Sequence, residues 1–171
     1  MTTLQETLTL LDYGMKRIEL VDSTKSNDIL NKVSFFNDFS QDEKKVLAGF
    51  HSHFFVAKSG THIIEQGGGD QSFYIILTGQ VSVQHANSDT HLAVLNPGDS
   101  FGEISFLTDR KRTTSVVAES KSILFEIDKT TLRNLPASIR EKLKDNIIQV
   151  LVVRLDQMNQ RVAELTKTAA P

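Results

Sequence analysis

Short runs of apolar and β-branched residues, separated by turn signals, fill the middle of this chain. Between residues 51 and 128, runs rich in Phe, Val, Ile and Thr recur every eight to twelve residues, with Gly, Asn, Asp and Pro-Gly sequences between them. This spacing is typical of an antiparallel β-sandwich or barrel. The expected strands are Phe54–Ala57, His62–Glu65, Phe73–Leu77, Val81–His85, His91–Leu95, Ser115–Ala118 and Ile123–Ile127.

The N-terminal region has a helical pattern instead. Its apolar residues recur at steps of four and three, which predicts an amphipathic helix over residues 4–21. The polar stretch 22–27 is typical of a linker. Asn27 or Asp28 could then cap a short helix that continues through Val33. The stripe of the first helix consists of Leu4, Leu8, Leu11, Met15 and Ile18.

A further helix is predicted just before the strand-rich region. Ser40 is a typical N-cap residue, and Glu43 follows it three positions later. This pair forms the sequence signature of a capping box, in which each side chain bonds the backbone of the other residue. We expect the helix to end near Phe50.

The C-terminal region after residue 128 is again helical in pattern. Pro136 is expected in the first turn of a long helix, where its missing N–H is harmless. Apolar residues with heptad spacing favour a parallel two-stranded coiled coil and hence a homodimer. The tail 166–171 is expected to fray. The a positions would be Ile148, Leu155 and Val162, and the d positions Leu151, Met158 and Leu165.

These patterns together predict an α+β fold. Its centre would be an antiparallel, jelly-roll-like β-roll, with helices on its N-terminal side and one long C-terminal helix. Three parts are expected along the chain. Residues 1–27 form the N-terminal helix and linker, residues 28–135 form the roll with flanking helices, and residues 136–171 form the C-terminal helix and tail.

Composition narrows the functional classes. The 171 residues include no cysteine, which excludes disulfides, thiolate metal sites and a cysteine nucleophile. A net charge of −2 argues against general nucleic-acid binding, which needs a basic face. The first residues lack the basic and apolar regions of a signal peptide, and the aliphatic run Ile147–Val153 is too short to cross a bilayer. We therefore expect a cytoplasmic protein without a membrane segment.

Several other chemistries lack support. His51 and His53 would lie on one side of a strand, but position 57 is Ala57 and no acid follows nearby to complete a metal site, so none is expected. The Gly67–Gly69 run has neither the lysine nor the helix of a phosphate-binding P-loop, and is better explained as a turn. No nucleophile has a base at a defensible spacing, so no catalytic residues are predicted.

The segment Phe101–Val116 carries the strongest candidate chemistry. Gly102 lacks a Cβ and precedes a short helical signal, so a ligand could approach the free N–H groups of a helix start. The carboxylate of Glu103 can accept bonds from two hydroxyl groups, as a sugar presents them. The guanidinium of Arg112 can bind two phosphate oxygens at once. These residues suit a sugar phosphate that is bound without metal.

This segment resembles the phosphate-binding cassette of the cyclic nucleotide-binding domain family. The family pattern begins with Phe-Gly-Glu and aliphatic and small residues, and ends after a loop with Arg and a small or hydroxyl residue. Upstream, Gly60, the Glu65–Gly67 turn, Phe73–Gly79 and Leu95–Asp99 also fall where the family has strands and turns, so the resemblance covers about residues 30 to 140. The ligand-binding residues that the resemblance implies are Gly102, Glu103, Ile104, Ser105, Arg112, Thr113 and Thr114.

Each of these residues also has a simpler interpretation. Arg112 could be a solvated member of the charge cluster 109–112, Glu103 could cap the short helix, and Ser105 could be a packing residue. Two positions depart from the family. Lys111 replaces the proline that often precedes the arginine, and Thr113 replaces the alanine that often follows it. The hydroxyl of Thr113 could accept a bond from the exocyclic amine of guanine.

The resemblance implies a sensor that needs no cofactor and whose ligand is cyclic AMP or cyclic GMP. In the family, ligand draws the short helix inward, so Ile104, Phe106 and Leu107 would form the apolar side of a moving segment. The helix Ile139–Leu165 would be both lid and output. The chain has no room for an added helix-turn-helix, so direct DNA binding is not expected, and the output would pass to a dimer or an effector protein. The alternative is a β-roll that has lost its ligand and serves as a dimerising scaffold.

Overall fold

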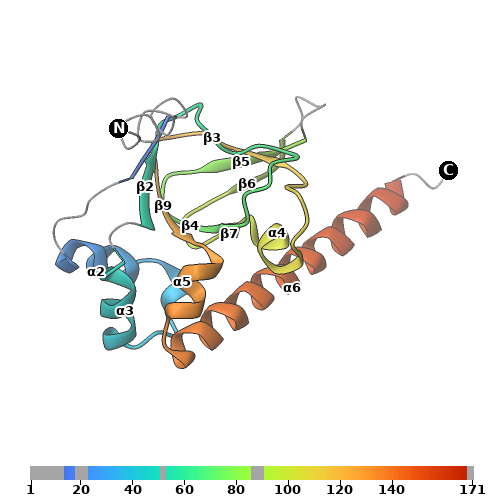
Figure 1. Cartoon of the computed structure of the whole chain (residues 1–171). Coiled ribbons are helices and arrows are strands. Elements are labelled where there is room, and N and C mark those ends of the chain that lie inside the picture. Colours follow the sequence, from blue (N-terminus) through green and yellow to red (C-terminus); the bar gives the residue numbers. More distant parts are fainter. Residues whose placement is uncertain (1–13, 18–22, 51–52, 86–90, 169–171) are drawn as a thin grey trace.

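The computed structural model describes residues 14–17, 23–50, 53–85 and 91–168. Helices enclose a β-roll on one side, and one long helix runs across its base (Figure 1). The helical elements are α2 (Ser23–Asn31), the 3-10 turn η1 (Ser34–Phe36), α3 (Gln41–Ala48), α4 (Glu103–Thr108), α5 (Lys129–Asn134) and α6 (Ala137–Thr168). The strands are β1 (Met15–Arg17), β2 (Phe54–Ala57), β3 (His62–Ile64), β4 (Phe73–Thr78), β5 (Val81–Gln84), β6 (His91–Leu95), β7 (Ser100–Phe101), β8 (Ser115–Ala118) and β9 (Ser122–Ile127).

The nine strands form two antiparallel sheets in the described part of the chain. One sheet has the order β1-β2-β9-β4-β7 and the other the order β3-β8-β5-β6. The predicted α+β fold with an antiparallel β-roll is confirmed, and all seven expected strands are present within one or two residues of their predicted ends. The sequence did not reveal β7, because a two-residue strand is too short to show an alternating pattern.

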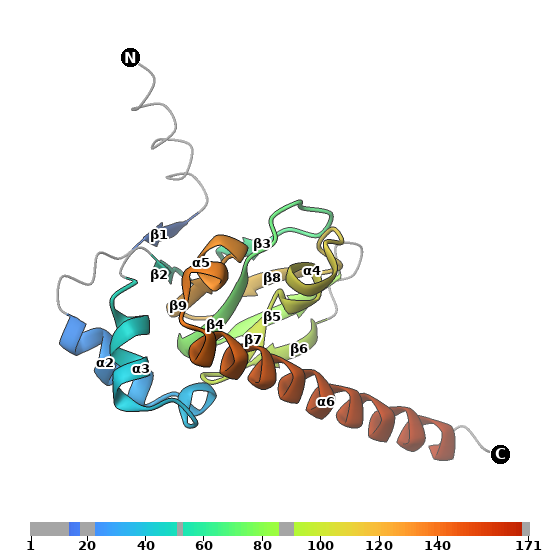
Figure 2. The same ribbon diagram turned by 60° about the horizontal axis from the view of Figure 1, so that its bottom comes forward.

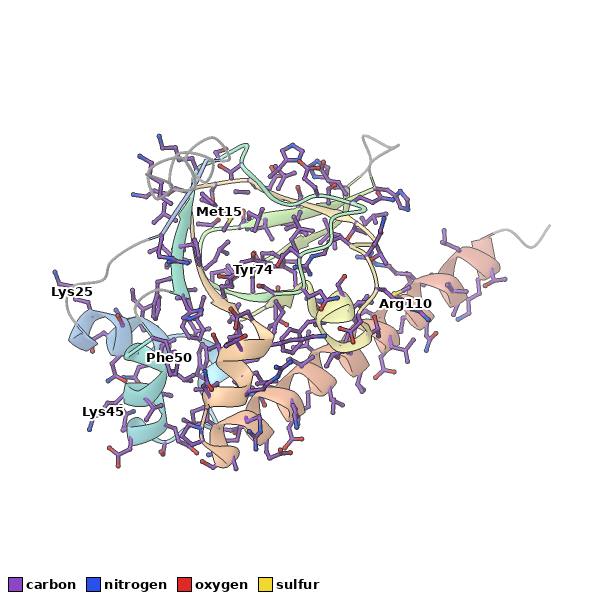
Figure 3. The ribbon with its side chains drawn as sticks, viewed as in Figure 1. Met15, Lys25, Lys45, Phe50, Tyr74 and Arg110 are labelled. Carbon is purple, nitrogen blue, oxygen red and sulfur yellow. The ribbon has the colours of Figure 1, made fainter. Side chains whose placement is uncertain are left out.

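Strand β4 explains why the middle of the chain is so apolar. Phe73, Ile75 and Leu77 face the helices and belong to one buried cluster, whereas Tyr74 and Ile76 point into the roll and belong to a second. Both faces of the strand are therefore buried, which produces a continuous apolar run rather than simple alternation. Figure 3 shows Tyr74 among the side chains inside the roll.

Aromatic contacts join the helical side to the sheet. The ring of Phe125 on β9 lies 4.8 Å from that of Phe54 and 6.4 Å from that of Phe36, measured between centroids. Phe36 comes from η1, so this short turn is anchored in the core. Such pairs add about 0.5–1.5 kcal/mol each to the burial of the rings. The same buried cluster includes Ile139 and Leu143, so these aromatic residues also hold the first turns of α6.

Helix α6 is buried only in its first half. Ile139, Leu143 and Ile147 are almost fully buried at helical spacing against the core. Residues 155–167 of the helix are all exposed. Figure 2 shows this second half extending past the roll. The helix continues to Thr168, so the predicted fraying from residue 166 does not occur over the last described residues.

The N-terminal predictions need correction. Met15 lies in strand β1, paired with Ala57, and not in a helix; Leu4, Leu8, Leu11 and Ile18 lie outside the described residues. A strand forms at Met15 because its backbone pairs with β2, which overrides the helical spacing of a single short stripe. Helix α2 begins at Ser23, inside the predicted linker, so the expected boundary at residue 27 falls within this helix.

The capping-box prediction is confirmed at α3. The backbone N–H of Glu43 donates to Ser40 Oγ at 3.2 Å, and the backbone N–H of Ser40 donates to Glu43 Oε2 at 2.8 Å. The helix ends at Ala48, two residues before the predicted end. Among the described helices, none combines the length and apolar character that a membrane crossing requires.

Candidate functional site

A small cavity lies at the end of the roll where α4 meets the start of β8. Its volume is about 180 Å³. All seven residues that the family resemblance implied as ligand-binding line it. The lining residues are Ile64, Val83, Phe101, Gly102, Glu103, Ile104, Ser105, Arg112, Thr113, Thr114, Val116 and Arg154.

Gly102 is required by the backbone at the start of α4. It has a left-handed conformation with φ of 83°, which an L side chain rarely adopts. A Cβ at this position would lie 2.7 Å from Arg112 Nη1 and 3.0 Å from the carbonyl oxygen of Ser72. The glycine therefore allows the helix start to approach the arginine closely.

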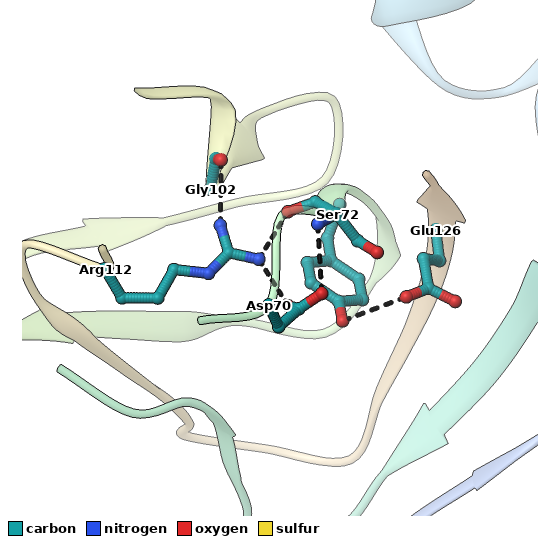
Figure 4. Close-up of polar contacts among 6 residues, drawn as sticks. Asp70, Ser72, Gly102, Arg112 and Glu126 are labelled. Carbon is teal, nitrogen blue, oxygen red and sulfur yellow. Dashed lines mark hydrogen bonds and ion pairs between the residues drawn. The ribbon is translucent and has the colours of Figure 1, made fainter. Parts of the chain in front are cut away.

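Arg112 is held inside the protein by backbone and side-chain acceptors (Figure 4). Its Nη1 donates to the carbonyl of Gly102 at 2.8 Å, and its Nη2 donates to the carbonyl of Ser72 at 2.5 Å and forms an ion pair with Asp70. Only 4% of the residue is exposed. The interpretation of Arg112 as a solvated member of a charge cluster is therefore wrong. Among the described residues, its Nε has no hydrogen-bond partner.

The glycine turn between β3 and β4 also positions Arg112. The backbone N–H of Gly67 donates to the carbonyl of Arg112 at 2.8 Å, and the N–H of Arg112 donates to the carbonyl of Gly68 at 3.0 Å. Gly67 has φ of 83°, as a tight turn requires. The run of glycines is thus a turn, as predicted, and its two backbone hydrogen bonds hold the main chain of Arg112.

Glu103 is the second buried charged residue of the cavity. Only 2% of it is exposed, and its Oε1 accepts a hydrogen bond from Arg154 Nη1 at 2.5 Å. Its Oε2 has no hydrogen-bond partner among the described residues. Burial raises the pKa of Glu103, while the guanidinium groups of Arg154 and Arg112 oppose that shift.

The remaining predicted residues divide by exposure. Ser105 is buried, Thr114 is half-buried, and Thr113 is exposed at the rim.

Phe106 of α4 packs edge-on against Phe73 with ring centroids 4.8 Å apart.

The predicted apolar side of α4 is only partly correct. Ile104 and Leu107 are half exposed, so Phe106 is the residue that anchors the helix in the core. The side chains of Ile104 and Leu107 lie on other faces of this one-and-a-half-turn helix, because residues one and two positions apart do not share a face.

Two polar residues of the site were missed by the sequence analysis. Asp70 follows the glycine turn, and Arg154 lies on α6, 51 residues after Glu103. Arg154 also donates from its Nη2 to the carbonyl of Ser100. The sequence position of Arg154 did not indicate a role in the site, since an arginine between the apolar heptad positions of a helix usually faces solvent. Only the packing of α6 against β7 reveals its role.

A second polar pair lies beside the arginine network. The hydroxyl of Tyr74 donates to Glu126 Oε1 at 3.2 Å, and Figure 4 labels Glu126 at the end of this bond. The ring of Tyr74 stacks on that of Phe101 with centroids 5.3 Å apart. Burial, together with the nearby carboxylates of Glu126 and Asp70, raises the pKa of the Tyr74 hydroxyl. Tyr74 therefore remains neutral, and its ring lies beside Phe101 on the neighbouring strand β7, which leads into the cavity.

The described residues contain no group of three His, Asp or Glu side chains arranged to hold a metal ion. His51 lies outside the described residues. His53 Nε2 lies 3.2 Å from Thr131 Oγ1 and its ring packs against Phe50, so this histidine joins β2 to α5.

Comparisons with known proteins agree on one family. The family model described as "Cyclic nucleotide-binding domain" matches residues 54–138. A cAMP-dependent protein kinase regulatory subunit from Yarrowia lipolytica is 28% identical over 80% of this chain and 35% of its own length. A regulatory subunit of the same kind from Dictyostelium discoideum is 30% identical over 81% of this chain and 42% of its own length. The chain thus spans less than half the length of these curated relatives.

Solved structures support the same assignment. A cyclic nucleotide-binding domain from Methylobacillus flagellatus covers 92% of each chain with a TM-score of 0.72 and 23% identity, and so shares the fold. The catabolite activator protein of Thermus thermophilus covers 77% of this chain and 62% of its own, with a TM-score of 0.63 and 26% identity. From the family-model match over residues 54–138, the similar regulatory subunits and the shared fold, this chain belongs to the cyclic nucleotide-binding domain family.

Proposed function

We propose that this chain binds a cyclic mononucleotide in the cavity beside α4 and acts as a regulatory sensor rather than as an enzyme. Cyclic AMP is the primary candidate, and cyclic GMP is a second ligand that Thr113 could accommodate. The names of similar proteins support this choice, since they include regulatory subunits of cAMP-dependent kinases and a cGMP-dependent kinase from Caenorhabditis elegans. No cofactor is part of the proposal.

The observation that carries the proposal is a pair of buried polar atoms that belong to two residues lining the same cavity. Arg112 Nε is a donor and Glu103 Oε2 is an acceptor, and neither has a hydrogen-bond partner among the described residues. A buried polar atom without a partner costs about 1–3 kcal/mol, and more when the group is charged. A cyclic nucleotide would satisfy both atoms, because its phosphate oxygens accept hydrogen bonds and its ribose hydroxyl donates one.

The cavity must enlarge to take such a ligand. Its volume of about 180 Å³ lies below the range of about 300–1,000 Å³ that is typical of ligand pockets. Two elements border it: α4, whose Phe106 is buried while Ile104 and Leu107 are half exposed, and α6, which reaches the cavity through Arg154. The described geometry therefore corresponds to the more closed of two states.

Arg154 provides the link from ligand to output. Its guanidinium bonds both Glu103 and the carbonyl of Ser100, so it ties α6 to β7 and α4. A ribose hydroxyl on Glu103 would change the charge and the hydrogen bonds that Arg154 experiences. Two positions of α6 are then possible, one with Arg154 bound to Glu103 and one with that ion pair altered. A ligand that binds one of these states more tightly shifts α6 toward it.

We further propose that α6 joins two copies of the chain. Leu155, Met158, Val162 and Leu165 are all more than half exposed on the projecting part of the helix, and Ile148 is as exposed before it. Leu151, the remaining predicted d position, is instead only partly exposed and packs on the core, so it does not belong to the seam. An isolated helix gains little stability without packing of an apolar face, so this seam needs a partner. A parallel coiled coil with a second copy is the arrangement that its heptad spacing favours.

The alternative function is a scaffold that dimerises through α6 without binding nucleotide. Lys111 favours it to some extent, because a lysine in place of proline leaves the loop before Arg112 less restricted. The buried donor and acceptor in the cavity argue for the sensor, since a scaffold gains nothing from two unpartnered polar atoms.

Isothermal titration calorimetry with cyclic AMP and cyclic GMP tests the proposal. Arg112→Ala should weaken binding by about a hundredfold or more, because removing one partner of a buried charge pair costs about 2–5 kcal/mol. Arg110→Ala is the matched control, since Arg110 is an exposed arginine two residues away (Figure 3). Wild-type protein that binds neither nucleotide would favour the scaffold. If Arg112→Ala binds nucleotide as tightly as wild type does, Arg112 is not a ligand-binding residue.

A further inference from the structure

Strand β6 leaves one edge of its sheet open. It is the last strand in the order β3-β8-β5-β6, and in the described part of the chain it pairs only with β5. In an antiparallel pair, alternate residues direct their N–H and C=O groups away from the partner strand. The outer edge of β6 therefore presents backbone groups to which another extended segment could add.

A groove of about 840 Å³ follows this edge, between β6, η1 and α6. One wall carries Leu92 and Val94, which are 46% and 48% exposed, and the facing wall on α6 carries Val153 and Met158, which are 54% and 63% exposed. Apolar side chains from two elements thus face one another across an open channel. An open strand edge beside an apolar channel is what β-strand addition requires. The backbone hydrogen bonds supply affinity, and the channel that receives alternate side chains supplies specificity.

The ends of the groove differ in charge. Asp38 and Asp99 lie at the end where Asn146 of α6 donates to the carbonyl of Phe35 at 2.6 Å. Arg161 lines the groove about four turns further along α6. An extended segment in the groove would therefore have its basic residue beside the two aspartates and its acidic residue beside Arg161.

We propose that this groove binds an extended peptide segment of an effector protein, added to β6 as an antiparallel fifth strand. Since β6 runs from the Arg161 end toward the aspartate end, an antiparallel segment begins at the aspartates. From its N-terminus to its C-terminus, the peptide would therefore carry a basic residue, then alternating apolar residues, and finally an acidic residue. The apolar side chains on one face enter the channel between Val94 and Val153.

The groove and the nucleotide cavity share one residue, Arg154, which lines both. Resting on the proposed function, this sharing couples the two sites, because ligand at Glu103 alters the hold of Arg154 on α6 and so the width of the groove. An effector that binds the groove would in return change nucleotide affinity by the same factor.

A second copy of the chain is not the occupant that the surface favours. Leu155 and Val162, at the centre of the proposed dimer seam, do not line the groove. Helical residues that differ in position by two point in nearly opposite directions, so Val153 and Leu155 serve different surfaces. Of the seam residues, Met158 also lines the groove, but a dimer centred on Leu155 and Val162 would leave β6, Val94 and Val153 accessible.

The test uses fluorescence anisotropy with the labelled probe peptide Lys-Val-Thr-Val-Thr-Val-Glu and the full chain. We expect saturable binding that weakens by about tenfold or more in Val94→Lys, as for loss of a central interface residue. Val46→Lys is the matched control, because Val46 is a valine of similar exposure on α3, away from the groove. A peptide with proline at its central position should not bind, and one with exchanged terminal charges should bind more weakly.

Each outcome has a separate meaning. Absence of probe binding, or equal binding by Val94→Lys, would overturn the groove proposal. A change from dimer to monomer in Val94→Lys during sedimentation would assign the face to a second copy and also overturn it. Unchanged probe affinity at saturating cyclic AMP would overturn the coupling through Arg154. Failure of calorimetry to detect nucleotide binding concerns only the proposed function, because the probe is titrated first without nucleotide.

Discussion

Replacing Arg154 with methionine removes the guanidinium that holds Glu103 while it keeps an unbranched stem on α6. A hydrogen bond to a charged group contributes about 1.5–3 kcal/mol, and removal of one partner from a fully buried pair costs about 3–5 kcal/mol. The side chain of Arg154 is 28% exposed, whereas that of Glu103 is 3% exposed. Solvent therefore screens one partner, and we expect Arg154→Met to lower the free energy of unfolding by about 2 kcal/mol.

The loss should depend on pH. Burial already raises the pKa of Glu103 above its ordinary value of 4.5, so the folded state binds this proton more tightly than the unfolded state. Stability from this group is complete below the unfolded pKa and is lost as pH rises through the folded pKa. Without Arg154 the folded pKa rises further. The deficit of Arg154→Met should therefore be largest near pH 8 and should shrink toward pH 5.

Urea unfolding at several pH values measures this effect. Glu103→Gln should make the deficit of Arg154→Met small and independent of pH, because a neutral amide does not need the guanidinium. Arg161→Met, a substitution in the exposed part of the same helix, is the control for the loss of an arginine from α6. An equal deficit at pH 5 and pH 8, or full additivity with Glu103→Gln, would refute the reasoning.

Three further predictions concern the backbone, the base and the dimer. Gly102→Ala should destabilise the fold by about 1–3 kcal/mol in thermal unfolding, because its φ of 83° and the nearby Arg112 Nη1 oppose a Cβ; an unchanged melting temperature would contradict this. Thr113→Ala should weaken cyclic GMP more than cyclic AMP by about 1 kcal/mol in calorimetry, whereas equal losses would mean that Thr113 does not contact the base. Leu155→Asp with Val162→Asp should give monomers in sedimentation; wild type that is already monomeric at tens of micromolar would exclude the seam.

The fold was largely readable from the sequence because its signals are local. Strands such as Phe54–Ala57 and Ser115–Ala118 are bounded by turns and appear where predicted. The capping box at Ser40 is likewise a short-range pattern that depends on two residues only. Tertiary pairing explains the errors, since Met15 becomes a strand through its contact with β2, which no local spacing reveals.

The site was readable in part for a different reason. The residues from Gly102 to Thr114 are close in sequence, so a family pattern could identify them together. Asp70 and Arg154 come from other elements, and only the packing of the β3–β4 turn and of α6 brings them against Arg112 and Glu103. The sequence also could not predict that Arg112 is buried, because its neighbours Arg110 and Lys111 are exposed charges.

Nitrogen-15 NMR of the arginine side chains tests the central claim most directly, namely that Arg112 Nε is the donor that awaits a phosphate. On addition of cyclic AMP, we predict that one Nε–H resonance shifts strongly downfield and becomes protected from exchange with solvent, as a charge-assisted hydrogen bond requires. The assignment to Arg112 follows if that resonance is absent from Arg112→Lys and present in Arg110→Lys. Nucleotide binding that leaves every arginine Nε–H resonance of the wild-type protein unchanged would contradict the account.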